Sequence, residues 1–386
     1  MKSFQVQDRV IGAVLRPSLR GLITLVTVLS LTILSSGASM AQDLIKETRS
    51  FNQPFEVTSL AISPKGDWVA SSGTLSSSLV VNRTEDGTEL ARMELPVASS
   101  AFNSLAISHD GKYLAACTGA RGVVRVFDTT SWRLLIEVNQ PYPGMCSDLV
   151  FSPDSQLLAV AYNRFSPSHR QFPAVILYNT ADWKSSNELV LQTKFALRVR
   201  FSAKKTLAVG TVSYEGCTPE CGSITTWNFG EKTGEVSHQI FAKNRVVSLA
   251  NVLGNRLLIG TKIYTLAETQ GWKAGTVSTP PPTQIDVDGL VLAELSGNEP
   301  VFNPVHLAEK GTVRAIASSP SSDLVVAVLD SSESSLIAVD LRNLAIRQKI
   351  FVGNEGLYAA SEIASNRLFA VSFKNEVRLY HVNKFE

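Results

Sequence analysis

Four cysteines are the residues of this chain with the clearest capacity for covalent chemistry, and their spacing favours disulfide bonds over metal binding. Cys217 and Cys221 are close enough in sequence to close a small ring across the tip of a loop. Cys117 ends one apolar segment and Cys146 begins another, so these two thiols can join neighbouring strands in a second bridge. A zinc site at Cys217 and Cys221 would need further ligands, for which the sequence offers no motif, so we expect no metal and no cofactor.

The densest basic cluster contains Arg198 and Arg200, followed by Lys204 and Lys205. Because alternate residues of a strand face the same side, both arginines would project together from a strand. If that strand lies on a central channel, the pair is placed to receive an anion. The alternative is that each arginine pairs with an acidic residue of a neighbouring sheet.

Loops with basic and aromatic residues are the candidate binding elements. The segment 163–173 combines two arginines, a histidine and two phenylalanines, a composition that suits an anionic or aromatic partner. The alternative is an ordinary solvated loop. The candidate binding residues are Arg164, Phe165, His169, Arg170, Phe172, Tyr214 and Glu215.

Sequence signatures of catalysis are missing. The chain has no Gly-x-Ser-x-Gly elbow, no His-Glu-x-x-His, no phosphate-binding loop and no dinucleotide fingerprint. Its five histidines are scattered. We therefore assign no catalytic residue and favour binding over catalysis.

A repeated phrase indicates the elements that must position these residues. The phrase reads SLAISPKGDWVA at 59–70, SLAISHDGKYLA at 104–115 and DLVFSPDSQLLA at 148–159, with weaker copies downstream. The aligned positions are Ser63, Ser108, Ser152, Ser202, Val252, Ser319 and Ile363. Their steps of 45, 44, 50, 50, 67 and 44 residues, filled by short apolar runs, predict an all-β propeller with one blade per repeat.

Each copy predicts four strands. The phrase itself supplies an innermost strand, a tight turn and a near-continuous apolar strand of the kind that is covered on both faces. A third run follows, such as VVRVFD at 123–128 and AVILYN at 174–179. These aromatic-Asp endings resemble the WD-repeat propeller family over nearly the whole chain after residue 41, although the Gly-His pair that opens a WD repeat is missing. We therefore expect a WD-like propeller of an exported bacterial type.

The ends of the repeat array predict how the ring closes. The last copy stops after its third strand, and segment 46–55 precedes the first copy without a blade of its own. The resemblance implies that this segment supplies the missing outer strand of the last blade, which removes two exposed sheet edges. The step of 67 residues predicts seven four-stranded blades with an insertion, with long loop sequence at 278–311, or else eight blades with one degenerate.

The first 41 residues have the pattern of a secretory signal peptide. Four basic residues precede an apolar run at 21–34, and Ser39 and Ala41 occupy the small positions before a cut. The run is shorter than the roughly 20 residues that span a bilayer, so we expect cleavage and no stable membrane insertion, with retention as an anchor the alternative. We assign 1–41 to the signal and 42–386 to a single propeller domain.

Removal of the signal leaves a chain with balanced charge. The whole chain has 36 basic and 34 acidic residues. The signal contains four of the basic residues and one of the acidic residues, so 32 basic and 33 acidic residues remain. This balance offers no bulk attraction to nucleic acid or anionic membrane. We expect a monomeric, periplasmic or secreted propeller that binds a protein or peptide through the face carrying its long loops. The alternative is a propeller enzyme of that compartment, similar to lactonases or quinone-linked dehydrogenase subunits, with an axial active site.

Overall fold

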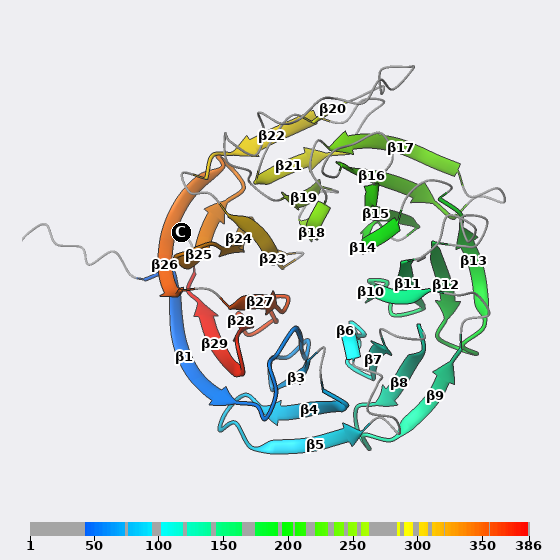
Figure 1. Ribbon diagram of the computed structural model, residues 1–386, viewed down its shortest axis with the longest axis horizontal. Coiled ribbons are helices and arrows are strands. Elements are labelled where there is room, and N and C mark those ends of the chain that lie inside the picture. The colour runs from blue at the N-terminus through cyan, green and yellow to red at the C-terminus, as the bar shows by residue number, and fades with distance from the viewer. Residues whose placement is uncertain are drawn as a thin grey trace, which may run out of the picture. The chain divides into compact units, whose positions relative to one another are not determined.

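The computed structural model shows seven sheets, each with an antiparallel core of four strands, arranged around a central axis (Figure 1). The structure describes residues 43–73, 76–94, 102–118, 122–139, 144–163, 174–191, 195–203, 205–213, 221–230, 235–242, 246–252, 256–261, 284–285, 289–295, 301–307, 311–319, 321–354 and 356–384. All regular elements in these ranges are strands. The propeller unit runs from Leu44 to Glu386, and the seven-blade interpretation with an insertion is confirmed.

Each blade has an innermost strand beside the axis and an outermost strand at the rim. Blade 1 contains β2 (Ser59–Ile62), β3 (Trp68–Ser72), β4 (Ser78–Arg83) and β5 (Glu89–Glu94). Blade 2 contains β6 (Phe102–Ile107), β7 (Tyr113–Thr118), β8 (Val124–Asp128) and β9 (Leu134–Val138). Blade 3 contains β10 (Met145–Phe151), β11 (Leu157–Asn163), β12 (Val175–Asn179) and β13 (Ser185–Leu189).

The remaining four blades follow the same order from axis to rim. Blade 4 contains β14 (Phe195–Ala203), β15 (Thr206–Ser213), β16 (Cys221–Asn228) and β17 (Glu235–Ala242). Blade 5 contains β18 (Val246–Val252), β19 (Arg256–Thr261), β21 (Leu290–Glu294) and β22 (Val301–Val305). Blade 6 contains β23 (Thr312–Ala317), β24 (Leu324–Asp330), β25 (Ser334–Asp340) and β26 (Ala345–Gly353). Blade 7 contains β27 (Leu357–Ala360), β28 (Leu368–Phe373), β29 (Glu376–Val382) and β1 (Ile45–Asn52).

The N-terminal strand closes the ring as expected. Strand β1 pairs antiparallel with β29, from Ile45 opposite Val382 to Asn52 opposite Glu376. Ile45 is fully buried in the core between blades 6 and 7, and its backbone N–H donates to Gln348 Oε1 of β26 at 2.7 Å. Strand β1 therefore contacts blade 6 as well as blade 7, the blade that it completes.

The insertion lies inside blade 5. It separates the second strand, β19, from the third, β21, and it includes β20 (Gln284–Ile285), which pairs in parallel with the outer strand β17 of blade 4. The prediction that 278–311 is loop is wrong over β21 and β22. Leu290, Val291 and Leu292 are buried between blades, so the apolar piece is a core strand of this blade and no eighth blade is formed.

Apolar contacts between neighbouring blades form the core. The described buried side chains fall into seven clusters, each shared by two adjacent blades; one of them joins blade 7 to blade 1 through residues such as Leu379 and Leu60. The middle strands are buried along nearly their whole length, whereas the rim strands alternate with solvent. This burial on both faces explains the continuous apolar runs of the repeat.

The repeated serine of the phrase shapes the turn between the first two strands. The Ser108 and Ser152 hydroxyls accept hydrogen bonds from the backbone N–H groups of Tyr113 and Leu157, both at 2.9 Å. At the end of the third strand, the Asp128 side chain accepts from the backbone of Ser131 at 2.7 Å and begins the turn to the rim strand. Asn179, Asn228 and Asp340 begin the corresponding turns in blades 3, 4 and 6, each accepting from the backbone N–H two residues further on, as Asp128 also does from Thr130. The aromatic-Asp ending of the sequence is therefore a turn signal.

The two faces of the ring differ in their connections. One face carries the links from second to third strand within a blade and from one blade to the next; we call it the long-loop face. The opposite face carries the links from first to second and from third to fourth strand; we call it the short-turn face. Among the described residues, no helix has the length and apolar character that a bilayer crossing requires.

A disulfide joins blades 2 and 3 at the long-loop face. Cys117 in β7 bonds Cys146 in β10, with 5.9 Å between the Cα atoms, and both side chains are fully buried. The predicted second bridge is confirmed. The predicted Cys217–Cys221 bridge involves side chains that the structure does not describe, so it stays a prediction.

Ring closure predicts a large effect of Ile45. Ile45→Ala should lower the free energy of unfolding by about 3 kcal/mol, because it removes buried methyl groups from the core between blades 6 and 7 and leaves a cavity. Urea denaturation of the variant and of Lys46→Ala, an exposed neighbour on the same strand, provides the comparison. Equal stability of the two variants would contradict this role for β1.

We expect removal of the disulfide to lower the free energy of unfolding by a similar amount. A Cys117→Ala/Cys146→Ala double variant should be less stable than the oxidised protein by about 3 kcal/mol, since the bond closes a loop of 29 residues in the unfolded chain. Denaturation with and without a reducing agent measures the difference. Intact mass after alkylation without reduction must show these two thiols protected; labelling at both would show that the bond does not form.

Candidate functional site

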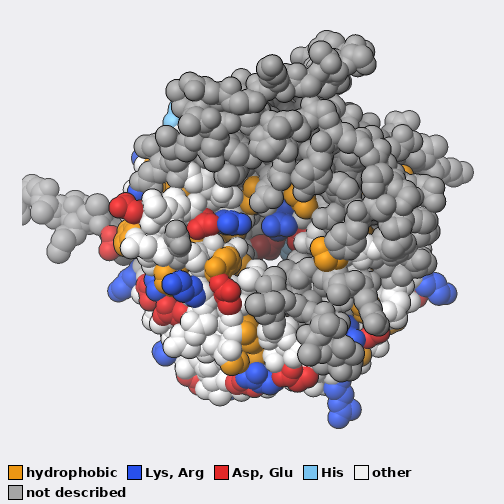
Figure 2. Space-filling view, viewed as in Figure 1, with side chains coloured by type: hydrophobic (Ala, Val, Ile, Leu, Met, Phe, Trp, Pro, Cys, Tyr) orange, Lys and Arg blue, Asp and Glu red, His pale blue; other side chains and the backbone are white. Residues whose placement is uncertain are grey.

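A polar cavity of about 130 Å³ lies on the axis, lined by the innermost strands of all seven blades. Its charged lining residues are Asp148 of β10, Arg198 and Arg200 of β14, and Arg314 of β23. Figure 2 shows Lys or Arg and Asp or Glu side chains gathered around this central opening. We take the cavity as the candidate functional site.

Bulges in the inner strands help to aim these side chains. In blades 2 to 7, the pairing of the first strand with the second shifts register near the start of the first strand. In β14 the shift falls between Ala196 and Arg198, and in β23 it falls between Val313 and Ala315. Such bulges bend a strand and redirect its side chains, here at the long-loop end of the axis.

Asp148 connects three blades. Its Oδ1 atom accepts from the Ser104 hydroxyl of blade 2 at 3.1 Å. Its Oδ2 atom accepts from the backbone N–H of Val199 at 3.0 Å and from Arg200 Nη1 at 2.8 Å, both in blade 4. The Asp148 side chain is 8% exposed, so this buried carboxylate is held by one cation and two neutral donors.

A second group of ionised side chains lies where the cavity meets the long-loop face. Arg314 Nε donates to Asp330 Oδ2 at 2.8 Å. Hydrogen bonding to Glu56, burial, and the negative charge of Glu56 and Asp330 raise the pKa of the Tyr358 phenol, while Arg314 opposes the rise. Tyr358 therefore stays protonated and acts as a donor at neutral pH.

Hydroxyl groups of the lining tie other blades together. Ser147 of blade 3 donates to the backbone carbonyl of Ala196 in blade 4 at 2.7 Å, and Ser248 of blade 5 donates to that of Val313 in blade 6 at 2.8 Å. Thr58 differs, because its Oγ1 atom is buried without a hydrogen-bond partner in the described part of the chain. An unpaired buried hydroxyl costs folding free energy.

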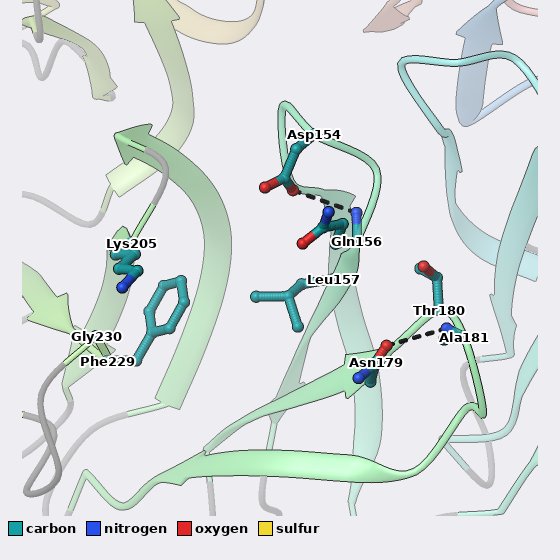
Figure 3. A pocket seen from close by; sticks show the side chains of 9 residues that line it. All are labelled: Asp154, Gln156, Leu157, Asn179, Thr180, Ala181, Lys205, Phe229 and Gly230. Carbon is teal, nitrogen blue, oxygen red and sulfur yellow. Dashed lines mark hydrogen bonds between the residues drawn. The ribbon is translucent and has the colours of Figure 1, made fainter.

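A larger hollow of about 570 Å³ lies on the short-turn face between blades 3 and 4 (Figure 3). Its polar side chains serve the adjoining turns: Asp154 accepts from the backbone of Gln156 at 3.2 Å, and Asn179 accepts from that of Ala181 at 3.0 Å. Leu157 and Phe229 line it between these turns. We attribute this hollow to the gap between neighbouring turns.

Of the site residues that we predicted from the sequence, the structure describes Arg198 and Arg200. Arg198 and Arg200 both line the axial cavity, and Arg200 also forms the ion pair with a neighbouring blade that was the alternative interpretation. The other candidate binding residues lie outside the described residues; these are Arg164, Phe165, His169, Arg170, Phe172, Tyr214 and Glu215. The structure therefore describes the axial candidates and leaves the loop candidates as predictions.

Sequence reasoning missed Asp148, Arg314 and Tyr358 as site residues. A signal was present, because Asp148 occupies the repeat position that holds Ser59 and Ser104 in the first two blades. Arg314 and Tyr358 each lie one position before that point in their own blades. Charged or aromatic residues at an axial repeat position otherwise held by small residues mark the site.

Comparisons with known proteins agree with this architecture. The family model described as WD domain, G-beta repeat matches residues 45–81 and 92–128. The chain is similar to the solved structure of U3-55K, with a TM-score of 0.62 and 14% identity over 88% of this chain and 99% of that chain. It is equally similar to the WD40 repeats of RRP9, with a TM-score of 0.62 and 15% identity over 89% and 98%. A search of curated proteins found no match. These likenesses support the WD-repeat resemblance and show the propeller fold.

The role of Asp148 predicts a strong dependence of stability on its charge. Asp148→Asn should lower the free energy of unfolding by about 3 kcal/mol, because Arg200 loses its partner in a mostly buried setting. The matched control is Asp86→Asn, which breaks the solvent-exposed pair with Arg83 and should leave stability unchanged. Chemical denaturation of both variants measures the difference. Equal losses of stability would show that the axial ion pair stabilises the fold no more than the exposed pair does.

Proposed function

We propose that the protein is an exported binding module that recognises a protein or peptide partner through its long-loop face. The observation that supports this best is the ionised opening of the axial cavity on that face, where Arg314, Asp330, Glu56 and Tyr358 meet. Charged and aromatic groups on a rigid ring can select a partner without moving. We also infer that the propeller acts as a monomer and does not bind nucleic acid, since its charges balance after removal of the signal.

Two features support export to the periplasm or the cell exterior. The basic and apolar leader at 1–41 has the composition of a secretory signal. The Cys117–Cys146 disulfide is typical of an oxidising compartment. Together they favour a mature chain that begins at Gln42 and folds after export.

The alternative function is a propeller enzyme with an axial active site. Such a site needs acid–base groups that are available to a substrate. In the described lining of the cavity, Asp148 supplies the carboxylate, and three donors already hold it. This engagement favours binding over catalysis.

The proposed function predicts a partner retained by one face of the ring. The full chain, captured from the exported fraction without reducing agents, should retain a partner. An Arg164→Ala/Arg170→Ala variant of the long-loop face should lower recovery by about tenfold. Lys112→Ala, which changes an exposed residue on the short-turn face, is the matched control and should retain the partner.

Quantitative mass spectrometry of the captured material reads out this experiment. The same measurement should find Gln42 at the mature N-terminus. Recovery of no specific partner, or equal recovery by the long-loop variant and the control, would rule out the proposed surface.

A further inference from the structure

A recurring side chain fills the gap between neighbouring blades on the short-turn face; we call each such gap a slot. The side chain comes from the turn between the third and fourth strands. In blade 2 it is Trp132, with a φ of 57°, and its ring packs edge-on against Trp68 of blade 1 with 5.0 Å between the ring centroids. In blade 3 it is Trp183, also with a φ of 57°, and its ring packs in the same way against Tyr113 of blade 2 at 5.3 Å. Two successive slots are therefore filled by tryptophan.

Apolar side chains fill the slot at two further places in the ring. Leu344 has the same place in the turn of blade 6, with a φ of 57°, and it packs against the core between blades 5 and 6. In blade 1 this place is held by Gly87, and Phe51 of the closing strand lies against it, 3.4 Å from where a Cβ atom would be. Each of these slots is thus occupied by a side chain of the protein itself.

The slot between blades 3 and 4 is the hollow of about 570 Å³ in Figure 3. Leu157 is the first residue of β11, as Trp68 is of β3 and Tyr113 of β7, so it has the position against which the tryptophans pack. It stays partly exposed. Phe229 of blade 4 lines the hollow beside it and packs on Trp227 of its own blade, with 5.6 Å between the ring centroids. The volume lies within the range of roughly 300–1,000 Å³ that is usual for ligand pockets.

The sequence of the blade 4 turn has no aromatic residue at the place that fills the other slots. The backbone N–H of Phe229 donates to the carbonyl of Lys205 at 3.1 Å. The same bond in blade 2 runs from Thr129 to Lys112 at 3.0 Å, so the two turns align. Trp132 lies three residues after Thr129, whereas the residue three positions after Phe229 is a lysine. An aromatic group in this slot must therefore come from another molecule.

The polar groups around the hollow suit a neutral aromatic ring. The stem of Lys205 runs along Gly230, where an added Cβ atom would come 2.5 Å from Lys205 Cδ, and the side chain lies beside Phe229 in Figure 3. An ammonium group in this position can lie over the face of an aromatic ring. Asp154 on the blade 3 side balances its charge, so the hollow does not select a charged group. The amide of Gln156 carries an acceptor for an indole N–H.

We propose that this hollow binds a tryptophan side chain of a partner segment, which completes the slot as Trp132 and Trp183 complete the two slots before it. The ring would cover Leu157 and contact Phe229, and such aromatic contacts contribute strongly to binding. The hollow lies on the short-turn face, opposite the long-loop face. The site therefore goes beyond the proposed function and does not depend on it.

A short peptide tests the hollow directly. The probe carries 5-fluorotryptophan between glycines, with both ends blocked, and its fluorine NMR signal should shift and broaden as the full-length protein is added. Unlabelled peptides with tryptophan, leucine or alanine at the same place, and free indole, then compete with the probe. The alanine peptide should compete about tenfold less well than the tryptophan peptide, with the leucine peptide between them.

Variants connect the binding to the hollow. Ala181→Trp should abolish it, because this change puts an indole of the protein at the edge of the hollow. The matched control is Thr130→Trp, the same change in the equivalent turn of blade 2, where Trp183 fills the slot. Lys205→Gln should weaken binding about threefold, and Lys112→Gln at the equivalent position of blade 2 should leave it unchanged. All four substituted residues are exposed, so the variants should fold, and thermal unfolding checks this.

The outcomes decide the assignment. Saturable binding of the tryptophan peptide that Ala181→Trp removes and Thr130→Trp keeps supports it. Equal competition by the tryptophan and alanine peptides, or equal losses in the two tryptophan variants, overturns it. Free indole that binds as tightly as the peptide would assign the hollow to a small aromatic molecule and overturn the partner segment.

This experiment and the capture experiment for the long-loop face give independent results. The peptide titration uses no partner, so failure to capture one leaves the tryptophan site standing. Loss of the tryptophan site in turn leaves the proposed function unchanged, because the long-loop variant and its control are read out separately.

Discussion

Each sheet of the propeller is apolar on both faces, and only a neighbouring sheet on either side can cover it. In β24, six of the seven residues are buried, a pattern that no solvent-facing sheet tolerates. A linear stack of such sheets would leave one bare face at each end. The ring removes both bare faces, and the pairing of β1 with β29 covers the edge that β29 would otherwise expose.

Polar and charged side chains are concentrated along the axis of the ring. The innermost strands converge there, and their polar side chains add hydrogen bonds between blades to the apolar contacts. Asp148 alone joins blades 2, 3 and 4 through Ser104, Val199 and Arg200. Buried ion pairs of this kind hold side chains in one arrangement, which suits a surface that must select a partner. The Cys117–Cys146 bond, one residue before Ser147 and two before Asp148, holds the same strand from the long-loop side.

The repeat period and the apolar runs were sufficient to predict the blades and the order of their strands, because these follow from local turns and two-sided burial. Ser108 and Asp128 illustrate this, since each builds its turn with backbone groups a few residues away. The closing strand was predicted from the resemblance to WD-repeat propellers. The site was only partly predictable. Alternation along one strand identified Arg198 and Arg200, but the partnership of Arg200 with Asp148, 52 residues apart, depends on which blades are neighbours and where each inner strand bulges. The insertion was misplaced because its apolar segment at β21 could not be distinguished from loop sequence by spacing alone.

The closing strand imposes an order on folding. Glu47 in β1 and Tyr380 in β29 form a hydrogen bond across 333 residues of chain, so the first of the described strands pairs with the last of them. We expect contacts this distant in sequence to form late, so that β1 remains a free strand while the other blades assemble. Lys46, Glu47 and Arg49 are exposed along it, and charged edges of this kind resist pairing with other chains. The same residues that face solvent in the finished ring thus protect the unfinished one against aggregation.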